Sequence, residues 1–228
     1  MATTSRSRFS CKCPQPYTGP RCEQPIRSCR GYKNQPRTSG IHKILDNNGT
    51  SVKVYCDFDL TTSFTWTLLQ SHVRDMKMKS LQLNDAISSD SPSWMGYRLQ
   101  KSRMLSIQAD STKWRITCQH HGKTPPLTDY VYGAIKDMDI LKPIVNCAKV
   151  EFIKIRDTSC SNCTVHFFQN PSHTLHHYLS SPKKCEFNVT RGAEMTCEGE
   201  YFGYFYCKDK NHACSSSANA TTETWFGG

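Results

Sequence analysis

Cysteine is the residue type whose abundance and spacing most constrain the chemistry of this sequence. The chain holds 13 cysteines among 228 residues. Cysteines act as nucleophiles, bind zinc or form disulfides, and their surroundings decide which. An odd number of this size without a zinc-ligand pattern indicates a disulfide-bonded extracellular protein, with one cysteine whose partner lies elsewhere.

The C-x-x-C motif of Cys160 and Cys163 would suggest redox chemistry or half of a zinc site in a cytosolic protein. No second C-x-x-C completes a four-thiolate site, so we interpret both cysteines as disulfide-bonded, to each other or to other partners. Histidines also occur at spacings that metal sites use: His173, His176, His177, His120 and His121. Because Pro171 marks an irregular segment without the rigid scaffold of a metal site, we interpret the histidines as exposed loop residues.

Catalytic motifs are missing from the sequence. There is no G-x-S-x-G elbow, no H-E-x-x-H helix and no glycine-rich phosphate loop, and the acidic residues are scattered rather than paired. Cysteine and histidine occur together, but an oxidised cysteine is not a nucleophile. We therefore expect no catalytic residue, no cofactor and no metal ion. A secreted hydrolase that uses a histidine and an acid is the less favoured alternative.

Composition and glycosylation motifs agree on the secretory pathway. Hydrophobic residues make up 37% of the chain, and no run approaches the roughly 18 apolar residues of a membrane span. Four N-x-T motifs would accept glycans in that pathway, at Asn48, Asn162, Asn188 and Asn219. We therefore expect a secreted glycoprotein without a membrane span.

The net charge of +10 is concentrated in two segments. Residues 1–50 carry nine Lys or Arg against two acids, and residues 101–150 carry eight against four. A basic face attracts nucleic acid, acidic glycans or an anionic matrix. Nucleic acid is not expected as a partner, because the chain is disulfide-rich and has no nucleic-acid-binding motif. A true polyanion site and charges that only keep the surface soluble stay equal alternatives.

Alternating apolar and polar residues predict the strands that must position these groups. Period-two patterns run over residues 52–56, 64–68 and 113–118, and a largely apolar stretch spans 150–155. Asn47-Asn48-Gly49 predicts a turn before the first strand. Mixed spacing predicts short helices within residues 97–107 and 133–141. The mixture indicates an α+β fold built on an antiparallel sheet.

The first cysteines lie in the stretch CKCPQPYTGPRC. Three prolines and a glycine separate Cys13 from Cys22, and this turn-forming set predicts a disulfide between them. The spacing C-x-C-x5-G-x2-C resembles the C-terminal half of an EGF-like module over residues 11–23, carried by Cys11, Cys13, Tyr17, Gly19 and Cys22. In that family the cysteine at the position of Cys11 bonds further upstream. We therefore expect residues 1–10 to be unstructured, and an upstream segment with the signal peptide and the partner cysteine to be missing.

After a linker over residues 24–28, a second unit begins at Cys29. The order of Cys29, TSGIHKI, VKVYCDFD and TWTLLQ resembles the opening of a fibrinogen C-terminal-like domain. The resemblance implies that residues 29–228 form one disulfide-rich domain with a central antiparallel sheet. It also implies a disulfide between Cys29 and Cys56, which would stabilise the fold by about 3 to 4 kcal/mol.

Many members of that family carry an acidic calcium loop and then an aromatic ligand pocket near the C-terminus. Here only Asp209 matches the loop, and no cysteine follows the aromatic pair at Trp225, so ligand specificity does not transfer. The candidate recognition surface comprises Tyr201, Phe202, Tyr204 and Trp225. A core strand is the favoured interpretation of residues 201–206.

The order of the two modules, with stretches such as DSTKWRITC and CSNCTV, resembles secreted proteins of stony corals, including components of the skeletal organic matrix. This resemblance implies a non-enzymatic extracellular matrix or recognition protein, one associated with biomineralisation, with matrix proteins or glycans as partners. A glycan-binding, lectin-like protein is the alternative. The other cysteines permit many pairings, and the simplest neighbour pairs are Cys118 with Cys147, Cys185 with Cys197, and Cys207 with Cys214.

Overall fold

The computed structural model describes residues 12–32, 38–59, 62–121, 129–178, 184–189, 200–203 and 210–228. Within these ranges the chain forms β-strands, one α-helix, α1 (Lys101–Ala109), and one 3-10 helix, η1 (Cys29–Tyr32). The fold is therefore mostly β. The antiparallel sheet of the expected α+β fold is present, but the described residues include only one short α-helix.

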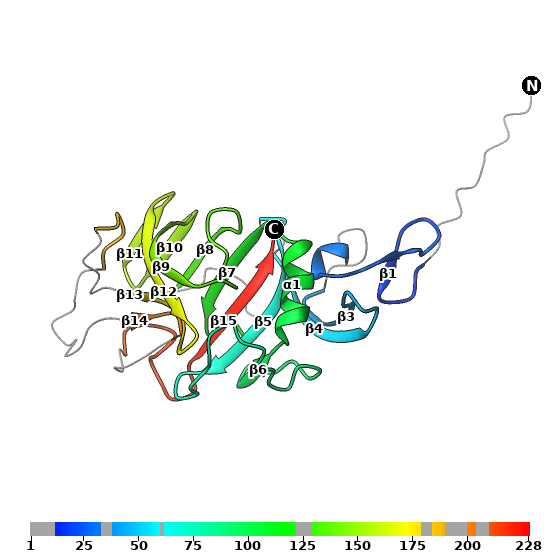
Figure 1. The fold of residues 1–228 in the computed structure, drawn as a ribbon, viewed down its shortest axis with the longest axis horizontal. Coiled ribbons are helices and arrows are strands. Elements are labelled where there is room, and N and C mark those ends of the chain that lie inside the picture. Colours follow the sequence, from blue (N-terminus) through cyan, green and yellow to red (C-terminus); the bar gives the residue numbers. More distant parts are fainter. Residues whose placement is uncertain are drawn as a thin grey trace, which may run out of the picture.

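A nine-stranded antiparallel sheet is the largest unit of the molecule. Its strands are β3 (Gly40–Leu45), β4 (Ser51–Phe58), β5 (Thr65–Val73), β6 (Gly96–Arg98), β7 (Lys113–Cys118), β8 (Tyr130–Ala134), β10 (Phe152–Ile155), β11 (Thr158–Ser161) and β15 (Thr221–Gly227). They follow the order β11-β10-β8-β7-β15-β5-β4-β3, and β6 pairs with β5. The last strand of the chain thus lies in the middle of the sheet, between β7 and β5 (Figure 1).

Two smaller sheets flank the large one. The strands β9 (Ile144–Lys149), β12 (Thr164–Asn170), β13 (His173–Tyr178) and β14 (Glu200–Tyr201) form a four-stranded sheet in the order β14-β13-β12-β9. Near the N-terminus, β1 (Tyr17–Thr18) pairs with β2 (Gln24–Pro25). Figure 1 shows these two sheets at opposite ends of the molecule, with α1 beside the central strands.

The pattern of buried residues explains why these segments form strands. In β4, Val52, Val54 and Cys56 are buried and alternate with more exposed neighbours, as the period of two predicts. Every residue of β15 is buried, so this strand is covered on both faces. Gly227 fits there because a Cβ atom would lie 2.1 Å from the Thr65 carbonyl oxygen. Any larger residue would push β15 away from β5.

The two expected helices have different outcomes. Within residues 97–107, α1 is present but begins at Lys101, because Gly96–Arg98 pairs with β5 as β6. The prediction of a helix over residues 133–141 is wrong, because Gly133 lies in β8 and pairs with Trp114 of β7. The Trp114 ring lies 3.2 Å from where a Cβ of Gly133 would be. Pairing across the sheet therefore overrides the local spacing.

Five disulfides join described cysteines. They include the two expected pairs, Cys13–Cys22 and Cys29–Cys56, and a local Cys160–Cys163 bond. The two others are Cys118–Cys214 and Cys147–Cys185. The three neighbour pairs expected from the sequence are therefore wrong, because the sheets bring distant cysteines together. Cys11, Cys197 and Cys207 lie outside the described residues.

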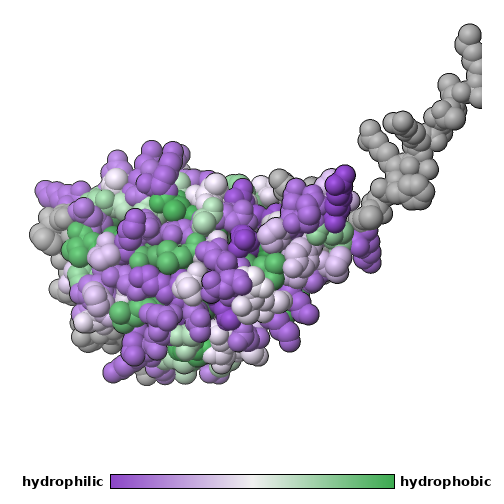
Figure 2. Space-filling view, turned by 45° about the vertical axis from the view of Figure 1, so that its right-hand side comes forward, coloured by the Kyte–Doolittle hydropathy of each residue, from purple (hydrophilic) through white to green (hydrophobic). Residues whose placement is uncertain are grey.

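Figure 2 shows one face of the molecule, and that face is largely polar. On the face shown in Figure 2, hydrophilic side chains cover most of the area, and hydrophobic ones form small separate patches. In the part of the chain that the structure describes, no helix has the length and apolar character that a membrane crossing requires.

Candidate ligand-binding pocket

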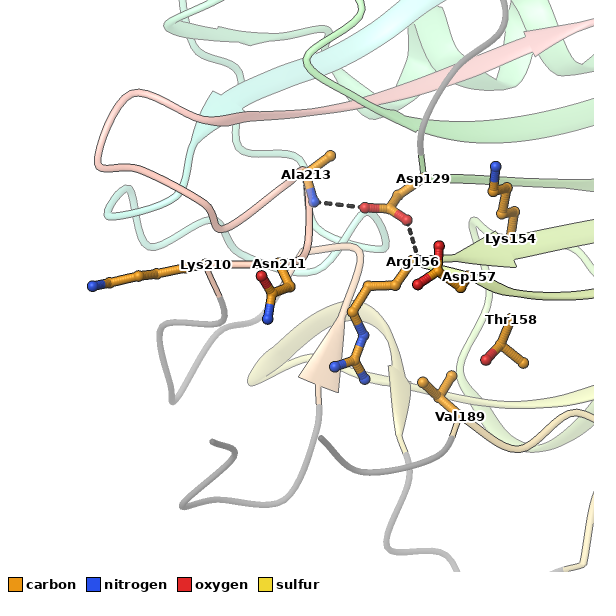
Figure 3. A pocket seen from close by; sticks show the side chains of 9 residues that line it. All are labelled: Asp129, Lys154, Arg156, Asp157, Thr158, Val189, Lys210, Asn211 and Ala213. Atoms are coloured by element: carbon orange, nitrogen blue, oxygen red, sulfur yellow. Dashed lines mark hydrogen bonds between the residues drawn. The ribbon is translucent and has the colours of Figure 1, made fainter. Parts of the chain in front are cut away.

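A polar pocket of about 730 Å³ lies where the β10–β11 hairpin faces the segment 210–213 (Figure 3). Its lining residues are Asp129, Lys154, Arg156, Asp157, Thr158, Val189, Lys210, Asn211 and Ala213. Four of these come from the hairpin, and the others come from segments far away in the sequence. This volume lies within the range of known small-molecule sites.

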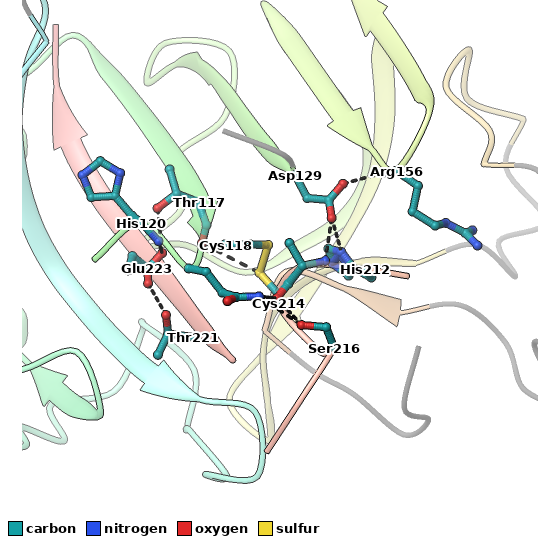
Figure 4. Close-up of a disulfide and its surroundings, with 12 residues drawn as sticks. Thr117, Cys118, His120, Asp129, Arg156, His212, Cys214, Ser216, Thr221 and Glu223 are labelled. Carbon is teal, nitrogen blue, oxygen red and sulfur yellow. Dashed lines mark hydrogen bonds and ion pairs between the residues drawn. A yellow bond between two sulfur atoms is a disulfide. The ribbon is translucent and has the colours of Figure 1, made fainter. Parts of the chain in front are cut away.

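Asp129 holds the two walls of the pocket together. Its carboxylate accepts a hydrogen bond from the Ala213 amide at 2.6 Å and another from the Arg156 amide. His212 Nδ1 lies 3.2 Å from the same carboxylate (Figure 4). Burial raises the pKa of Asp129 above its ordinary value, although these amide hydrogen bonds and nearby cations act in the opposite direction. The carboxylate is thus used inside the protein rather than offered to a ligand.

His212 is the neutral partner in this contact. Burial lowers the pKa of His212 to about 3, and the positive charge of Arg156 acts in the same direction. A neutral imidazole meets an ionised carboxylate favourably when Nδ1 carries the proton and donates it. His212 and Asp129 therefore form a hydrogen bond at neutral pH rather than an ion pair.

Arg156 is held at the back of the pocket. Its guanidinium donates a hydrogen bond to the Tyr201 hydroxyl at 2.8 Å and lies 5.8 Å from the centre of that ring. The Tyr201 ring in turn meets His212 edge-on at 4.7 Å. Stacking on tyrosine suits the flat guanidinium and fixes its direction.

Two lysines supply positive charge at the pocket surface. Lys154 is half-buried on β10, and Lys210 is exposed at the opposite wall. Neither forms a hydrogen bond or ion pair within the described ranges, whereas Lys113 pairs with Glu151 and Lys142 with Asp139. Neither ammonium group therefore has to break a hydrogen bond or an ion pair with a described residue to bind a ligand, although Lys154 is close enough to Asp129 to lower the pKa of that carboxyl.

The Cys118–Cys214 disulfide fixes the segment that forms one wall (Figure 4). Cys118 ends β7, and its amide donates to the Asp129 carbonyl. The Gln119 amide side chain donates to the Ala213 carbonyl at 2.6 Å, beside the disulfide. Covalent and hydrogen bonds thus anchor this wall to the end of the central sheet.

Cys118, Cys214 and His212 also form the one described group of three possible metal ligands, whose donor atoms lie within 4.8 Å of one another. The two sulfur atoms are bonded to each other. Zinc binds thiolates, and a disulfide sulfur is not one. In its oxidised form this group therefore acts as a crosslink.

A second buried polar cluster lies between β7 and β15. The Glu223 carboxylate accepts hydrogen bonds from the hydroxyls of Thr117 and Thr221 and from the His120 amide. Burial raises the pKa of Glu223 to about 7, although these hydrogen bonds lower it. A carboxyl with this pKa could act as a general acid or base. Glu223 and His120 are both 0% exposed, however, so no substrate reaches them in this conformation.

Arg115 forms the centre of the neighbouring cluster. Its guanidinium lies between Trp66 and Trp225, at 4.6 and 4.5 Å from their ring centres, and donates to Asp57 at 2.6 Å. Burial alone would raise the pKa of Asp57, but the neighbouring His120 and Arg115 hold it well below its usual range. Trp225 therefore packs against a buried cation within the fold.

The candidate recognition surface predicted from the aromatic residues is wrong for three of its four members. Tyr201 in β14, Phe202 directly after it and Trp225 in β15 are at most 1% exposed, so all three lie in the core. Tyr204 lies outside the described residues. The favoured interpretation of Tyr201 and Phe202 as core residues is the one that their burial supports.

The interpretation of the histidines as exposed loop residues is also wrong for most of them. His176 and His177 are buried within β13, and His120 is completely buried. Only His121 is exposed, and His173 is half-buried. β12 ends at Asn170 and β13 begins at His173, so Pro171 and Ser172 form only a short turn.

The four predicted glycosylation positions are all exposed. The side chains concerned are those of Asn48, Asn162, Asn188 and Asn219. Asn48 lies in the turn between β3 and β4, as the sequence predicts for residues 47–49. Every sequon thus offers a side chain that a glycan could extend into solvent.

Sequence reasoning missed the pocket. Its clearest local signal is KIRDT over residues 154–158, where two cations alternate along a hairpin. Nothing in the sequence connects this hairpin with Lys210. Neither the protein-family models nor the curated proteins compared with this chain give a match.

Proposed function

We propose that this protein is a non-enzymatic secreted protein of the extracellular matrix, or an extracellular recognition protein, that binds its partners through the pocket between the β10–β11 hairpin and segment 210–213. Five disulfides suit an oxidising compartment. The exposed asparagines of the four sequons suit glycosylation there. A mineralised skeletal organic matrix is the specific setting that the resemblance to coral proteins favours.

The fold assignment is part of this proposal. Residues 29–228 would form a fibrinogen C-terminal-like domain, and residues 11–23 a partial EGF-like module. The Cys29–Cys56 disulfide and the antiparallel sheet agree with the first assignment. The Cys13–Cys22 disulfide agrees with the second.

The observation that carries the function is the pocket itself. Its walls come from separate parts of the chain and are fixed by Asp129 and the Cys118–Cys214 disulfide. A rigid, preformed site binds without losing much conformational entropy. The lining is polar, and the His212–Asp129 pair beside it is buried, at 0% and 2% exposed, so recognition explains the pocket better than hydrolysis does.

The experiment is a binding measurement with the full-length chain made in a secretory host, so that disulfides and glycans form. The labelled protein is applied to immobilised extracellular matrix extract and to the organic fraction of a mineralised skeleton. We expect saturable binding that is lost when the disulfides are reduced. Non-saturable binding, or equal binding by the reduced protein, would contradict the proposal.

A lectin-like role is the second candidate, and the abundance of hydrogen-bonding groups in the pocket favours it. It predicts that a glycan fraction of the matrix extract competes for binding, whereas deglycosylated matrix protein does not. A secreted hydrolase is the least favoured alternative. It would require bound product or turnover in the same extracts, which mass spectrometry of the incubated glycans would detect.

A further inference from the structure

We propose that the pocket binds an acidic saccharide, a sugar bearing a carboxylate or sulfate group, through Lys154 and Lys210. This inference rests on the proposed function, since it names the ligand class of the same site. The two lysines lie on opposite walls, and Figure 3 shows their side chains running outward from the middle of the pocket, so the two ammonium groups lie at its rims. Charge at both rims fits an extended ligand that spans the pocket.

The charge balance at the pocket favours an anion. Asp129 faces inward, where Ala213 and Arg156 amides take up its carboxylate. Asp157 is the other acid among the lining residues that the structure describes, and it is exposed. Lys154 and Lys210 outweigh this one carboxylate, so the described lining residues offer a ligand more positive than negative charge. Ammonium groups hold carboxylates and sulfates by charge-assisted hydrogen bonds.

The neutral and acidic groups of the lining favour a sugar over a bare anion or an acidic peptide. Thr158 and Asn211 bring a hydroxyl and an amide to the pocket. Asp157 accepts hydrogen bonds from hydroxyl groups, which a saccharide has and which inorganic sulfate and glutamate side chains lack. Only a ligand with both an anionic group and hydroxyls uses all of these residues.

The size of the pocket agrees with this class. Its volume of about 730 Å³ is far larger than one sulfate ion needs and suits an organic ligand of several hundred daltons. Asp129 and the Cys118–Cys214 disulfide fix the spacing of the two walls. The site thus has room for more than one sugar ring and a frame that keeps the lysines apart.

The experiment measures the affinity of the full chain for defined probes at physiological ionic strength. The probes are a heparin-type sulfated oligosaccharide, a hyaluronan oligosaccharide, neutral maltooligosaccharide, inorganic sulfate and oligoglutamate. We expect binding of at least one acidic saccharide and no comparable binding of the other three. The response to the first two probes tells whether sulfate or carboxylate is the preferred group.

The test variant is Lys154→Ser with Lys210→Ser, and its matched control is Lys53→Ser with Lys136→Ser. The control lysines are exposed and do not line the pocket, and both variants lose the same charge. We expect the test variant to bind the acidic saccharide at least about tenfold more weakly, as expected for two lost ammonium contacts. Equal weakening in both variants would overturn the proposal, because binding would then follow net charge alone.

The variant Asp157→Asn provides an independent measurement, because it changes an exposed side chain and should fold normally. We expect it to bind inorganic sulfate more tightly and to lose part of its preference for the saccharide. An unchanged preference would overturn the assigned role of Asp157 and with it the saccharide. If the wild type binds matrix extract but none of the acidic saccharides, this inference fails while the proposed function stands. If the wild type binds neither, both fail.

Discussion

Glu223 is a carboxyl group that the fold buries completely, in contact with two threonine hydroxyls and one backbone amide. Its raised pKa of about 7 means that the folded protein prefers the protonated form, whereas the unfolded chain ionises near the ordinary value of 4.5. Because the folded state holds this proton more tightly than the unfolded chain does, the free energy of unfolding falls as the pH rises. The stability that the neutral form provides is therefore lost between pH 4.5 and 7, and amounts to about 3 kcal/mol.

The variant Glu223→Gln tests this assignment. Glutamine keeps the shape and an acceptor oxygen but cannot ionise. We expect the variant to be more stable than the wild type at pH 8 by up to about 3 kcal/mol, and to show no gain at pH 4.5. Urea unfolding at the two pH values measures the difference. A gain of the same size at both values would mean that packing, rather than ionisation, limits this site.

The Cys118–Cys214 disulfide is the crosslink that joins two elements important for the pocket, the end of β7 and the segment before β15. It spans 96 positions in the sequence. Replacing both cysteines by serine should lower the free energy of unfolding by about 4 kcal/mol, because a long loop gains much entropy when unfolded. Hydrogen exchange at the amides of residues 213–216 should also speed up more than exchange in β4.

The matched control is the double variant Cys160→Ser with Cys163→Ser, which opens a bond spanning only 3 positions. The same loop argument gives about 2 kcal/mol for this short crosslink. Exchange at residues 213–216 should stay at the wild-type rate. Equal exchange in the two variants would show that the Asp129 hydrogen bonds, and not the disulfide, hold this wall in place.

The strands that sequence analysis predicts correctly are those whose signal is local. The alternation over residues 52–56 lies within β4, where one buried face imposes a period of two. The alternation over residues 113–118 lies within β7, although there the polar Arg115 and Thr117 are buried as well. The strand β8 was not predicted, because Gly133 and its neighbours form a strand through pairing with Trp114 and the rest of β7, which are distant in the sequence. The strand β13 was not predicted either, because its buried histidines are polar residues and give no apolar pattern in the sequence.

The candidate pocket could not be predicted for a related reason. Its residues are spread from position 129 to position 213, and what unites them is the hydrogen bonding of Asp129 and the path of the chain around a disulfide. Cysteine pairing shows the same limit. Cys13 and Cys22 are close in sequence and were paired correctly, whereas Cys118 and Cys147 are also close but lie on strands of different sheets.

At the scale of the whole molecule, buried histidines should govern the response to acid. Burial lowers the pKa of His72, His176 and His177 to about 4, and that of His212 to about 3. Between about pH 4 and the ordinary value of 6.5, these histidines are neutral in the fold and protonated in the unfolded chain. These four groups therefore favour unfolding as the pH falls, and they exceed the one proton of Glu223 by about three. Burial also lowers the pKa of His120 and raises that of Asp129, and these two shifts act in opposite directions.

The net uptake of about three protons on unfolding predicts a loss of stability of up to about 4 kcal/mol per pH unit near pH 5. Urea unfolding between pH 7 and pH 5 should show this slope, with the disulfides intact. Because Glu223 binds its proton in the folded state, Glu223→Gln should make the slope steeper, whereas His177→Gln should make it shallower by about one proton. A slope that is the same in all three proteins would contradict the buried, neutral state of His177, since removing a group that titrates only on unfolding must change the proton balance.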